Sequence, residues 1–252
     1  MIPNPIHKAL STLRSRKVKH LLIGGQACVF YGAAEFSRDT DIAVLAEKDN
    51  LDRISSAMKD LSAEVIAVPQ FNAEFLKKGH AVHFRCKHPD AAGMRIDIMS
   101  VMRNVDPFEK LWERRTSIKT DEGSYDLISL PDLVLAKKTQ RDKDWPMIRR
   151  LVEANYFENK NLPGKKHVGF WLKELRTAEL LVEVANKYKK QVSSVLKDRP
   201  LLKFALSSSI KDLEKALFEE ELSERKKDRE YWNPLKEDLE KMRRSVRNPA
   251  VN

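Results

Sequence analysis

Two carboxylates lie one residue apart in the segment SRDTDIAVL, residues 37–45, where Asp39 and Asp41 precede a run of apolar residues. The apolar run predicts a buried strand, and aspartate is a poor strand former. Side chains two apart in a strand point to the same face, with Cα atoms roughly 6.6 Å apart. Unpaired carboxylates there repel each other, and a divalent cation such as Mg²⁺ removes the repulsion. The alternative is a surface turn in which Asp39 pairs with Arg38.

Two further features can complete a site around this aspartate pair. The segment LLIGGQA predicts a strand that ends at Gly24 and Gly25, where the free N–H groups that open the next helix suit a polyphosphate. A third aspartate, Asp97, lies in the strand-like segment MRIDIMSV. A lone carboxylate in an apolar strand is costly to bury unless a partner neutralises it. The candidate partners are Arg95, two residues earlier on the same face, and a shared metal ion.

A later segment, LAKKTQRDKD, carries a cluster of charged residues. If residues 137–144 are helical, Lys137, Arg141 and Asp144 lie on one face at positions i, i+4 and i+7. Lys137 and Arg141 can then bind a triphosphate, and Arg141 is the better bidentate donor. Two alternatives stay open, namely a solvated charged face and an Asp144 that only orients Arg141 or Lys143.

The elements that must position these residues divide the chain into two parts. A polar linker, ENKNLPGKKH, follows the last strand-like segments, and no strand pattern recurs after it. We therefore predict a mixed α/β (α+β) domain over residues 1–160, with a sheet flanked by helices, and a helical region over residues 161–252. In the helical region, apolar spacing predicts one long helix from Trp171 that ends before Pro200, and another across residues 202–217.

The predicted elements of the first part alternate between the two kinds of structure. Helices are predicted at residues 3–16, 26–36 and 50–61, and one or two more within residues 129–154, interrupted before Pro146. Strands are predicted near residues 18–25, 38–45, 80–86 and 94–101. Edge strands are predicted within residues 111–120 and 125–130.

Composition limits the class of protein. The 252 residues carry a net charge of +10, which favours a polyanionic partner such as nucleic acid. Two cysteines are too few for a disulfide framework. No apolar run approaches the roughly 20 residues that span a bilayer, and the N-terminal segment lacks the apolar stretch of a signal peptide. We expect a cytoplasmic protein without membrane contact.

The histidines and cysteine of GHAVHFRCKH do not predict a zinc site. On a strand, His83 and Cys86 point to opposite faces and cannot easily share one tetrahedral ion. His83, Arg85 and Lys87 line one face, where they can flank a nucleotide or an acceptor or form an exposed edge.

Taken together, the motifs resemble the nucleotidyltransferase superfamily with the DNA polymerase β-type fold. The pattern is Gly-Gly after a strand, thirteen residues, Asp-x-Asp before the next strand, and a third aspartate on a later strand. GGQACVFYG, FSRDTDIAVL and LPDLVLAKKTQRDKDWPMI resemble motifs of its bacterial group of AbiEii-like toxins and minimal relatives. The resemblance covers residues 20 to about 150.

The resemblance implies transfer of a nucleoside monophosphate from an NTP to an acceptor, with release of pyrophosphate. Asp39, Asp41 and Asp97 are implied to be catalytic and to hold two Mg²⁺ or Mn²⁺ ions, with Asp97 as a possible base. The residues implied to bind the nucleotide are Gly24, Gly25, Arg38, Thr40, Lys137, Arg141 and Asp144.

One position departs from the pattern of many relatives, which read Arg-x-Thr-x-Asp-hydrophobic-Asp. Alignment on Asp41 places Ala43 where the second metal ligand is expected, which implies a degenerate enzyme. Alignment on Asp39 completes the pair and fits the distance from Gly25. We prefer the alignment on Asp39.

The acceptor and the partners stay open. The positive charge and the basic segment Arg14–Lys19, which contains no acidic residue, favour RNA such as a tRNA end, although relatives also modify proteins or small molecules. Family analogy suggests the toxin of a toxin–antitoxin pair. The rival interpretation is a catalytically silent nucleotide- or RNA-binding module with the same fold. The C-terminal helices can also serve as a docking surface for an antitoxin-like protein.

Overall fold

The computed structural model describes residues 4–34, 37–121 and 123–247, which form two compact units. The first unit comprises Met1–Ala136 and Tyr231–Asn252, and the second unit comprises Lys137–Glu230. The functional division predicted at residue 160 stays a prediction. Within the described ranges, no helix combines the length and the apolar character needed to cross a membrane.

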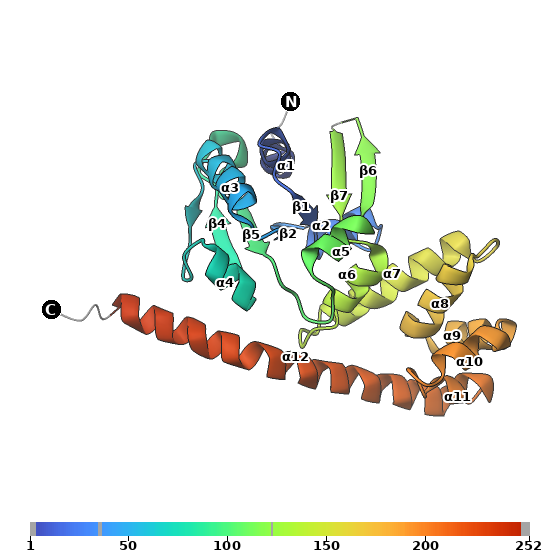
Figure 1. Ribbon diagram of the computed structural model, residues 1–252. Coiled ribbons are helices and arrows are strands. Elements are labelled where there is room, and N and C mark those ends of the chain that lie inside the picture. The colour runs from blue at the N-terminus through green and yellow to red at the C-terminus, as the bar shows by residue number, and fades with distance from the viewer. Residues whose placement is uncertain (1–3, 35–36, 122, 248–252) are drawn as a thin grey trace. The chain divides into compact units, whose positions relative to one another are not determined.

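A seven-stranded mixed sheet forms the centre of the first unit (Figure 1). Its strands, in spatial order, are β3 (Glu64–Val65), β4 (Val82–Arg85), β5 (Arg95–Met99), β2 (Thr40–Val44), β1 (His20–Leu22), β7 (Gly123–Leu127) and β6 (Thr116–Thr120). β2 and β5 are parallel, as are β1 and β7, and the other neighbours are antiparallel. The predicted mixed α/β class is confirmed.

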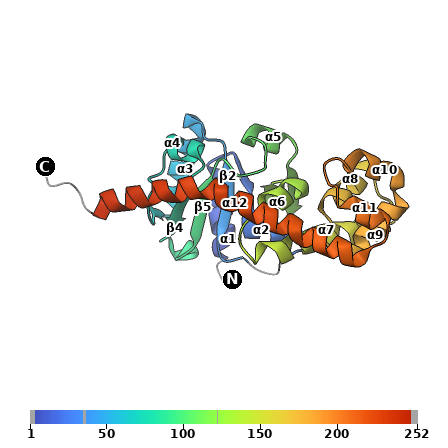
Figure 2. The same ribbon diagram turned by 90° about the horizontal axis from the view of Figure 1, so that it is seen from below.

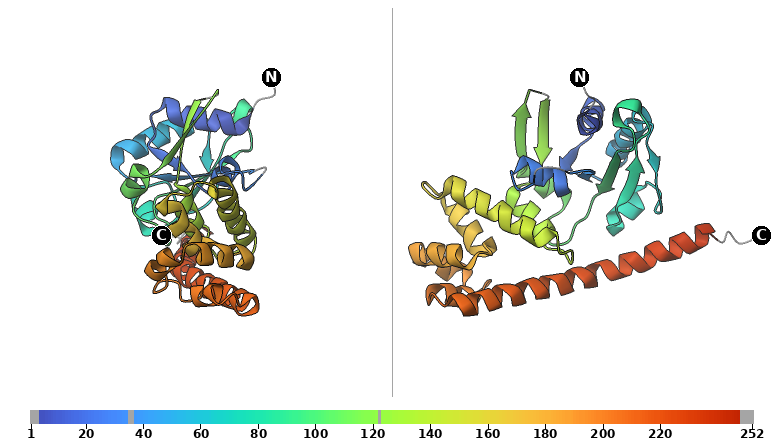
Figure 3. Two further views of the ribbon diagram at one scale, coloured as in Figure 1. Left: turned by 90° about the vertical axis from the view of Figure 1, so that its right-hand side faces the viewer. Right: turned by 180° about the vertical axis from the view of Figure 1, so that it is seen from behind.

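The strand predictions hold for the centre of the sheet but not for its sides, because the short edge strand β3 was not predicted. β6 is an edge strand as predicted, but β7 is interior because it pairs with both β1 and β6. The β6–β7 hairpin joins β1 at the pair Leu22 and Leu127, and the remainder of the hairpin extends beyond β1 (Figures 1 and 3).

The helices of the first unit pack their apolar faces on this sheet and on one another. The helices are α1 (Pro5–Ser15), α2 (Gly24–Phe30), α3 (Lys48–Asp60), α4 (Ala73–Lys78), the short 3₁₀ helix η1 (Pro89–Ala91), α5 (Phe108–Glu113) and α6 (Leu130–Ala136). In α3 the buried side chains include Leu51, Ile54 and Met58, at helical spacing. Asn4 caps α1 by accepting hydrogen bonds from the N–H groups of the first turn.

The second unit is helical, and α8 to α11 form a compact group (Figure 2). Its helices are α7 (Asp144–Asn159), α8 (Lys165–Glu174), α9 (Ala178–Lys187), α10 (Lys189–Val195), α11 (Leu202–Leu206) and the first part of α12 (Ile210–Arg247).

The prediction of one long helix from Trp171 to Pro200 is wrong, because the chain breaks after α8 and again after α9. The guanidinium of Arg199 explains the first break. It donates to the carbonyl oxygens of Leu172 and Leu175, each at 3.0 Å, and so supplies donors that a continuing helix would have provided. The helix predicted across residues 202–217 is also interrupted, between α11 and α12, where Ser208 has a φ of +55°.

The last part of α12 belongs to the first unit, where it packs near α4. Buried His80, just after α4, contacts Asp238 of α12 with 2.8 Å between Nε2 and Oδ2. A Cβ at Gly79 would lie 3.1 Å from the hydroxyl of Tyr231. These contacts fix the position of the last part of α12 within the first unit.

Candidate active site

The pairing of β2 with β5 brings Asp41 and Asp97 together. The strands are parallel neighbours, and the two aspartates are Cα partners. Paired positions direct their side chains to the same face of a sheet. The alternate residues Ile42, Ile96 and Ile98 are fully buried, which specifies the register because a slip by one residue would expose them.

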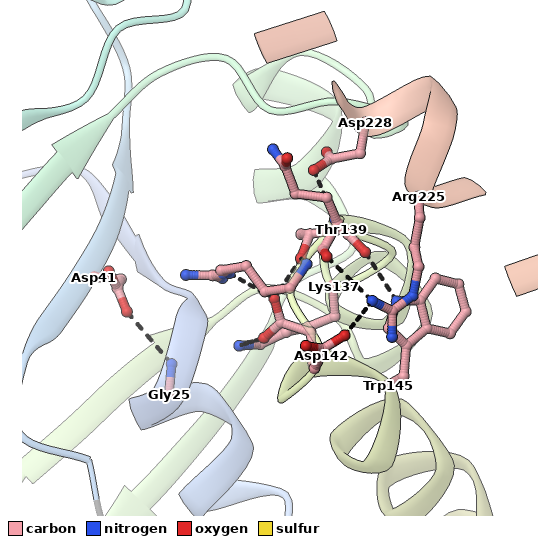
Figure 4. Close-up of polar contacts among 11 residues, drawn as sticks. Gly25, Asp41, Lys137, Thr139, Asp142, Trp145, Arg225 and Asp228 are labelled. Atoms are coloured by element: carbon pink, nitrogen blue, oxygen red, sulfur yellow. Dashed lines mark hydrogen bonds and ion pairs between the residues drawn. The ribbon is translucent and has the colours of Figure 1, made fainter. Parts of the chain in front are cut away.

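Gly24 and Gly25 lie against the carboxylate of Asp41. Gly24 begins α2 with a left-handed φ of +60°, and a Cβ there would lie 2.0 Å from Asp41 Oδ2. The N–H of Gly25 donates to the same oxygen at 3.4 Å (Figure 4). The sequence predicted a free N–H at Gly25. In the structure this N–H is directed at Asp41 instead. At this length the hydrogen bond is weak, and a phosphate oxygen can replace it.

Asp39 lies one residue before β2 in a loop that is tied to α2. The hydroxyl of Ser37 donates to the carbonyl oxygen of Asp39 at 3.1 Å. The buried side chain of Gln26, in α2, donates to the carbonyl oxygen of Ser37 at 3.1 Å. A Cβ at Gly25 would lie 2.4 Å from Ser37 Oγ, so this loop packs directly on the glycine turn. The Gly-Gly turn therefore lies against the carboxylate of Asp41 and against the loop that carries Asp39.

Arg38 and Thr40 are placed differently from each other. Arg38 is exposed next to Asp39 in the chain. Thr40 is fully buried, and alternation along β2 directs its side chain to the face opposite Asp41. Within the described part of the chain, its Oγ1 has no hydrogen-bond partner. The structure does not bring the Thr40 side chain together with the carboxylates.

Asp97 is 8 % exposed and makes contacts with two basic side chains. Arg95 holds it bidentately, with 2.6 Å from Nε to Oδ1 and 2.8 Å from Nη2 to Oδ2. His83 Nδ1 lies 2.8 Å from Oδ1. Burial alone would raise the pKa of Asp97, but the hydrogen bonds with His83 and Arg95 outweigh it and lower the pKa below its usual value.

The contact with His83 was not predicted. His83 and Asp97 are Cα partners on the antiparallel strands β4 and β5. Both strands were recognisable from the sequence, but their register was not, because the connection between them contains η1 rather than a tight turn.

The guanidinium of Arg95 is bonded to Asp97, and the charges of the other two aspartates also act on it. The hydrogen bond to Asp97 is the main cause that raises the pKa of Arg95, and the negative charges of Asp97, Asp39 and Asp41 add to the rise. The sequence suggested either Arg95 or a metal ion as the partner of Asp97. In the structure Asp97 forms an ion pair with Arg95. Arg95 thus supplies the positive charge that the buried carboxylate of Asp97 requires.

The carboxylates fit a divalent cation in their chemistry, with one condition. Mg²⁺ and Mn²⁺ prefer carboxylate oxygens, and Asp41 and Asp97 are paired on adjacent strands. Among the residues that the structure describes, no three His, Cys, Asp or Glu side chains are already arranged to hold a metal ion. Both oxygens of Asp97 contact Arg95, so this guanidinium would compete with a metal ion for the carboxylate.

The second unit contains the other predicted group of site residues. The prediction that residues 137–144 form one helix is wrong, because α6 ends at Ala136 and α7 begins at Asp144, two residues before Pro146. Lys137 and Asp144 nevertheless meet across the loop between these helices, with 3.1 Å from Lys137 Nζ to Asp144 Oδ1 (Figure 4). Their side chains are almost fully buried.

Asp144 organises this loop. Its Oδ2 accepts hydrogen bonds from Thr139 Oγ1 at 2.5 Å and from Arg141 Nε at 2.8 Å. Burial alone would raise the pKa of Asp144, but the charge of Lys137, the Thr139 hydrogen bond and the charge of Arg141 outweigh it and lower the pKa. Asp144 therefore orients Arg141, one of the two roles that the sequence left open, and it orients Lys137 as well.

Comparisons with known proteins give limited similarity. The chain matches no protein-family model, and a search of curated proteins found no significant match. One similar solved structure is an antigenic nucleotidyltransferase-like protein from Paracoccidioides brasiliensis, with 16% identity over 81% of this chain and 91% of that chain and a TM-score of 0.40.

A second similar structure is the antibiotic-resistance factor ANT(2'')-Ia, with 12% identity over 76% of this chain and 92% of that chain and a TM-score of 0.34. The description of the first structure names the superfamily that the sequence resembles, and neither description names the AbiEii-like group. At these TM-scores the similarities carry no inference about the activity of the chain.

Substitution of Gly24 tests whether the glycine turn positions Asp41. Gly24→Ala adds a Cβ onto Asp41 Oδ2, and Gly32→Ala is the matched control, because Gly32 has a φ of +72° and nothing within 4 Å of its added Cβ. Both variants lose about 1 kcal/mol of stability from the left-handed backbone. Gly24→Ala alone is expected to weaken Mn²⁺ binding, measured by calorimetric titration. Equal Mn²⁺ affinity in the two variants would show that the turn does not position Asp41.

Substitution of Asp144 tests the buried ion pair with Lys137. Asp144→Asn is expected to lower the free energy of unfolding at pH 7 by about 3 kcal/mol, because the buried Lys137 loses its counter-charge. A carboxylate with a lowered pKa stabilises the fold above the unfolded pKa of about 3.9, and this contribution is lost as the pH falls through the folded pKa. The difference from the wild type therefore shrinks below about pH 4.

Urea unfolding between pH 3 and pH 8 measures this effect. The control, Glu230→Gln, breaks the pair with Lys226, in which both side chains are mostly exposed, and is expected to change stability by less than about 0.5 kcal/mol. A stability difference for Asp144→Asn that is the same at pH 3 and pH 7 would contradict the assignment of this ion pair.

Proposed function

We propose that the chain is a metal-dependent nucleotidyltransferase that moves a nucleoside monophosphate from an NTP to an acceptor. The observation that supports this most is the register of β2 and β5, which pairs Asp41 with Asp97. Asp39 is close enough to the same guanidinium, that of Arg95, to raise its pKa. Carboxylates that can hold divalent cations near the reacting phosphate are what metal-dependent phosphoryl transfer uses.

Asp39, Asp41 and Asp97 would hold Mg²⁺ or Mn²⁺, in the proposed two-ion arrangement. When bound, the metal supplies Lewis acidity at the phosphate oxygens and lowers the pKa of the attacking hydroxyl. In the proposed reaction the acceptor oxygen bonds to the α-phosphorus, and the bond from that phosphorus to pyrophosphate breaks. The hydroxyl proton passes to solvent.

Asp97 serves better as a ligand than as the base suggested by the sequence. Its pKa is lowered by Arg95 and His83, so the group stays ionised at neutral pH. An ionised carboxylate is a good ligand for a hard cation, whereas a base with a low pKa accepts a proton poorly.

The nucleotide contacts belong to the same proposal. The Gly25 N–H is directed toward the carboxylate site, which suits contact with a phosphate group. Arg141 uses Nε to bond Asp144, and its side chain is 56% exposed, which leaves the guanidinium accessible to a phosphate. Lys137 has less freedom, because it is buried in its pair with Asp144. The exposed Arg38 is a further candidate.

RNA is the proposed acceptor, supported by the net charge of +10. The basic segment Arg14–Lys19 precedes β1, whose first residue His20 pairs with Val44 of β2. The segment therefore lies at the end of β2 that is opposite to Asp41. Such a position suits contact with the body of an RNA rather than with the reacting hydroxyl. A role as a toxin with an antitoxin-like partner rests on the sequence resemblance.

A catalytically silent nucleotide-binding module is the second candidate. The observation that favours it is Ala43, which is fully buried on the same face of β2 as Asp41 and cannot bind a metal. This module would bind NTP and form no product, and it would tolerate Asp39→Asn.

Label transfer tests the proposed activity. The protein is incubated with Mg²⁺, each α-labelled NTP in turn, and total bacterial RNA with lysate protein. The wild type is expected to label one acceptor class. The double variant Asp39→Asn/Asp41→Asn is expected to lose about 10³-fold in rate, because it removes two carboxylates of the site.

A matched control removes the same charge elsewhere in the first unit. Asp49→Asn/Asp52→Asn changes two exposed aspartates of α3 and is expected to keep the wild-type rate. Binding of NTP without labelling of any acceptor would favour the silent module. Labelling that survives in the Asp39→Asn/Asp41→Asn variant would overturn the proposed mechanism.

A further inference from the structure

Helix α12 holds the backbone of the loop that carries Lys137 and Arg141. The carboxylate of Asp228, 2 % exposed, accepts a hydrogen bond from the N–H of Gln140 at 2.8 Å (Figure 4). Arg225 Nη1 donates to the carbonyl oxygen of Gln140 at 3.2 Å. Both backbone polar groups of the residue that precedes Arg141 are therefore bonded to one turn of α12.

Arg225 is itself held in place on several sides. Its Nε and Nη2 donate to Oε1 of Glu221 at 2.9 and 2.7 Å, and its Nη1 also donates to Asp142 in the loop. Its guanidinium lies 5.7 Å from the centre of the Trp145 ring. The indole N–H of Trp145 donates to the carbonyl oxygen of Thr139 at 2.8 Å. The loop backbone is thus fixed at two successive residues.

The bonds from α12 limit the conformations that the loop backbone can adopt. Burying the carboxylate of Asp228 costs free energy unless its hydrogen bonds repay it. The loop carries Arg141, whose side chain is mostly exposed, whereas those of Lys137 and Asp144 are buried. A rigid backbone lowers the entropy that this long side chain loses when it binds an anion.

We propose that Asp228 and Arg225 are positioning residues, which hold Gln140 so that Arg141 presents its guanidinium to a polyphosphate anion. This inference rests on the proposed function. It assigns a role in ligand binding to the first part of α12, which the sequence left without one.

Polyphosphate binding tests the inference. Full-length wild type, Asp228→Ala, Asp228→Asn and Arg225→Ala are titrated with inorganic tripolyphosphate in the presence of Mg²⁺, well below their unfolding temperatures. Asp228→Ala and Arg225→Ala are expected to bind about tenfold more weakly. Asp228→Asn is expected to bind at least as tightly as the wild type, because the amide oxygen still accepts the hydrogen bond from Gln140 and a negative charge is removed.

Charge alone predicts the opposite result for Asp228→Ala, because removal of a negative charge strengthens binding of an anion. A tenfold loss in this variant must therefore come from the loop. The control for Arg225→Ala is Lys226→Ala, which removes the same charge from the neighbouring exposed residue and is expected to change affinity by less than about twofold.

Hydrogen exchange of the loop distinguishes failure of the positioning role from failure of the proposed function. The amide of Gln140 is expected to be protected in the wild type and in Asp228→Asn, and to exchange rapidly in Asp228→Ala. Faster exchange with unchanged tripolyphosphate affinity would overturn the positioning role and leave the proposed function intact. A wild type that binds neither tripolyphosphate nor any NTP would overturn the proposed function and this inference with it.

Discussion

The candidate site depends on the electrostatic balance between three aspartates and one arginine. The register of β2 and β5 places Asp41 beside Asp97, and the glycine turn holds Asp41 and the loop that carries Asp39. The buried carboxylate of Asp97 needs a positively charged partner, and Arg95 supplies it. A divalent cation can take over the same task, so the guanidinium and the metal compete for Asp97.

The second unit uses buried ion pairs for a different purpose. Asp144 gathers Lys137 and Arg141, and α12 fixes the backbone between them through Asp228 and Arg225. Buried ion pairs are weak evidence for stability, because desolvation offsets much of the attraction. Their value here is the defined geometry of a loop that would otherwise sample many conformations.

The sequence was sufficient to predict elements whose pattern is local. The strand around Asp97 was predicted at its correct place, because period-two alternation identifies a half-buried strand. The proximity of Lys137 and Asp144 was predicted on a helical face, whereas the structure achieves it by a loop and a buried ion pair. The break after α8 depends on Arg199, 24 residues beyond Leu175, and no local pattern contains that information. The contacts of His83, Asp228 and Arg225 were missed for the same reason, because each joins residues from different elements.

The most direct measurement of the central claim is the Mn²⁺ affinity of Arg95→Gln by calorimetric titration. Arg85→Gln is the matched control, because exposed Arg85 is the Cα partner of Arg95 on β4. If the guanidinium of Arg95 competes with the metal for the carboxylates, Arg95→Gln binds Mn²⁺ about tenfold more tightly than the wild type, and Arg85→Gln changes affinity by less than about threefold. Equal or weaker Mn²⁺ binding by Arg95→Gln would contradict the claim that Asp39, Asp41 and Asp97 form one cation site.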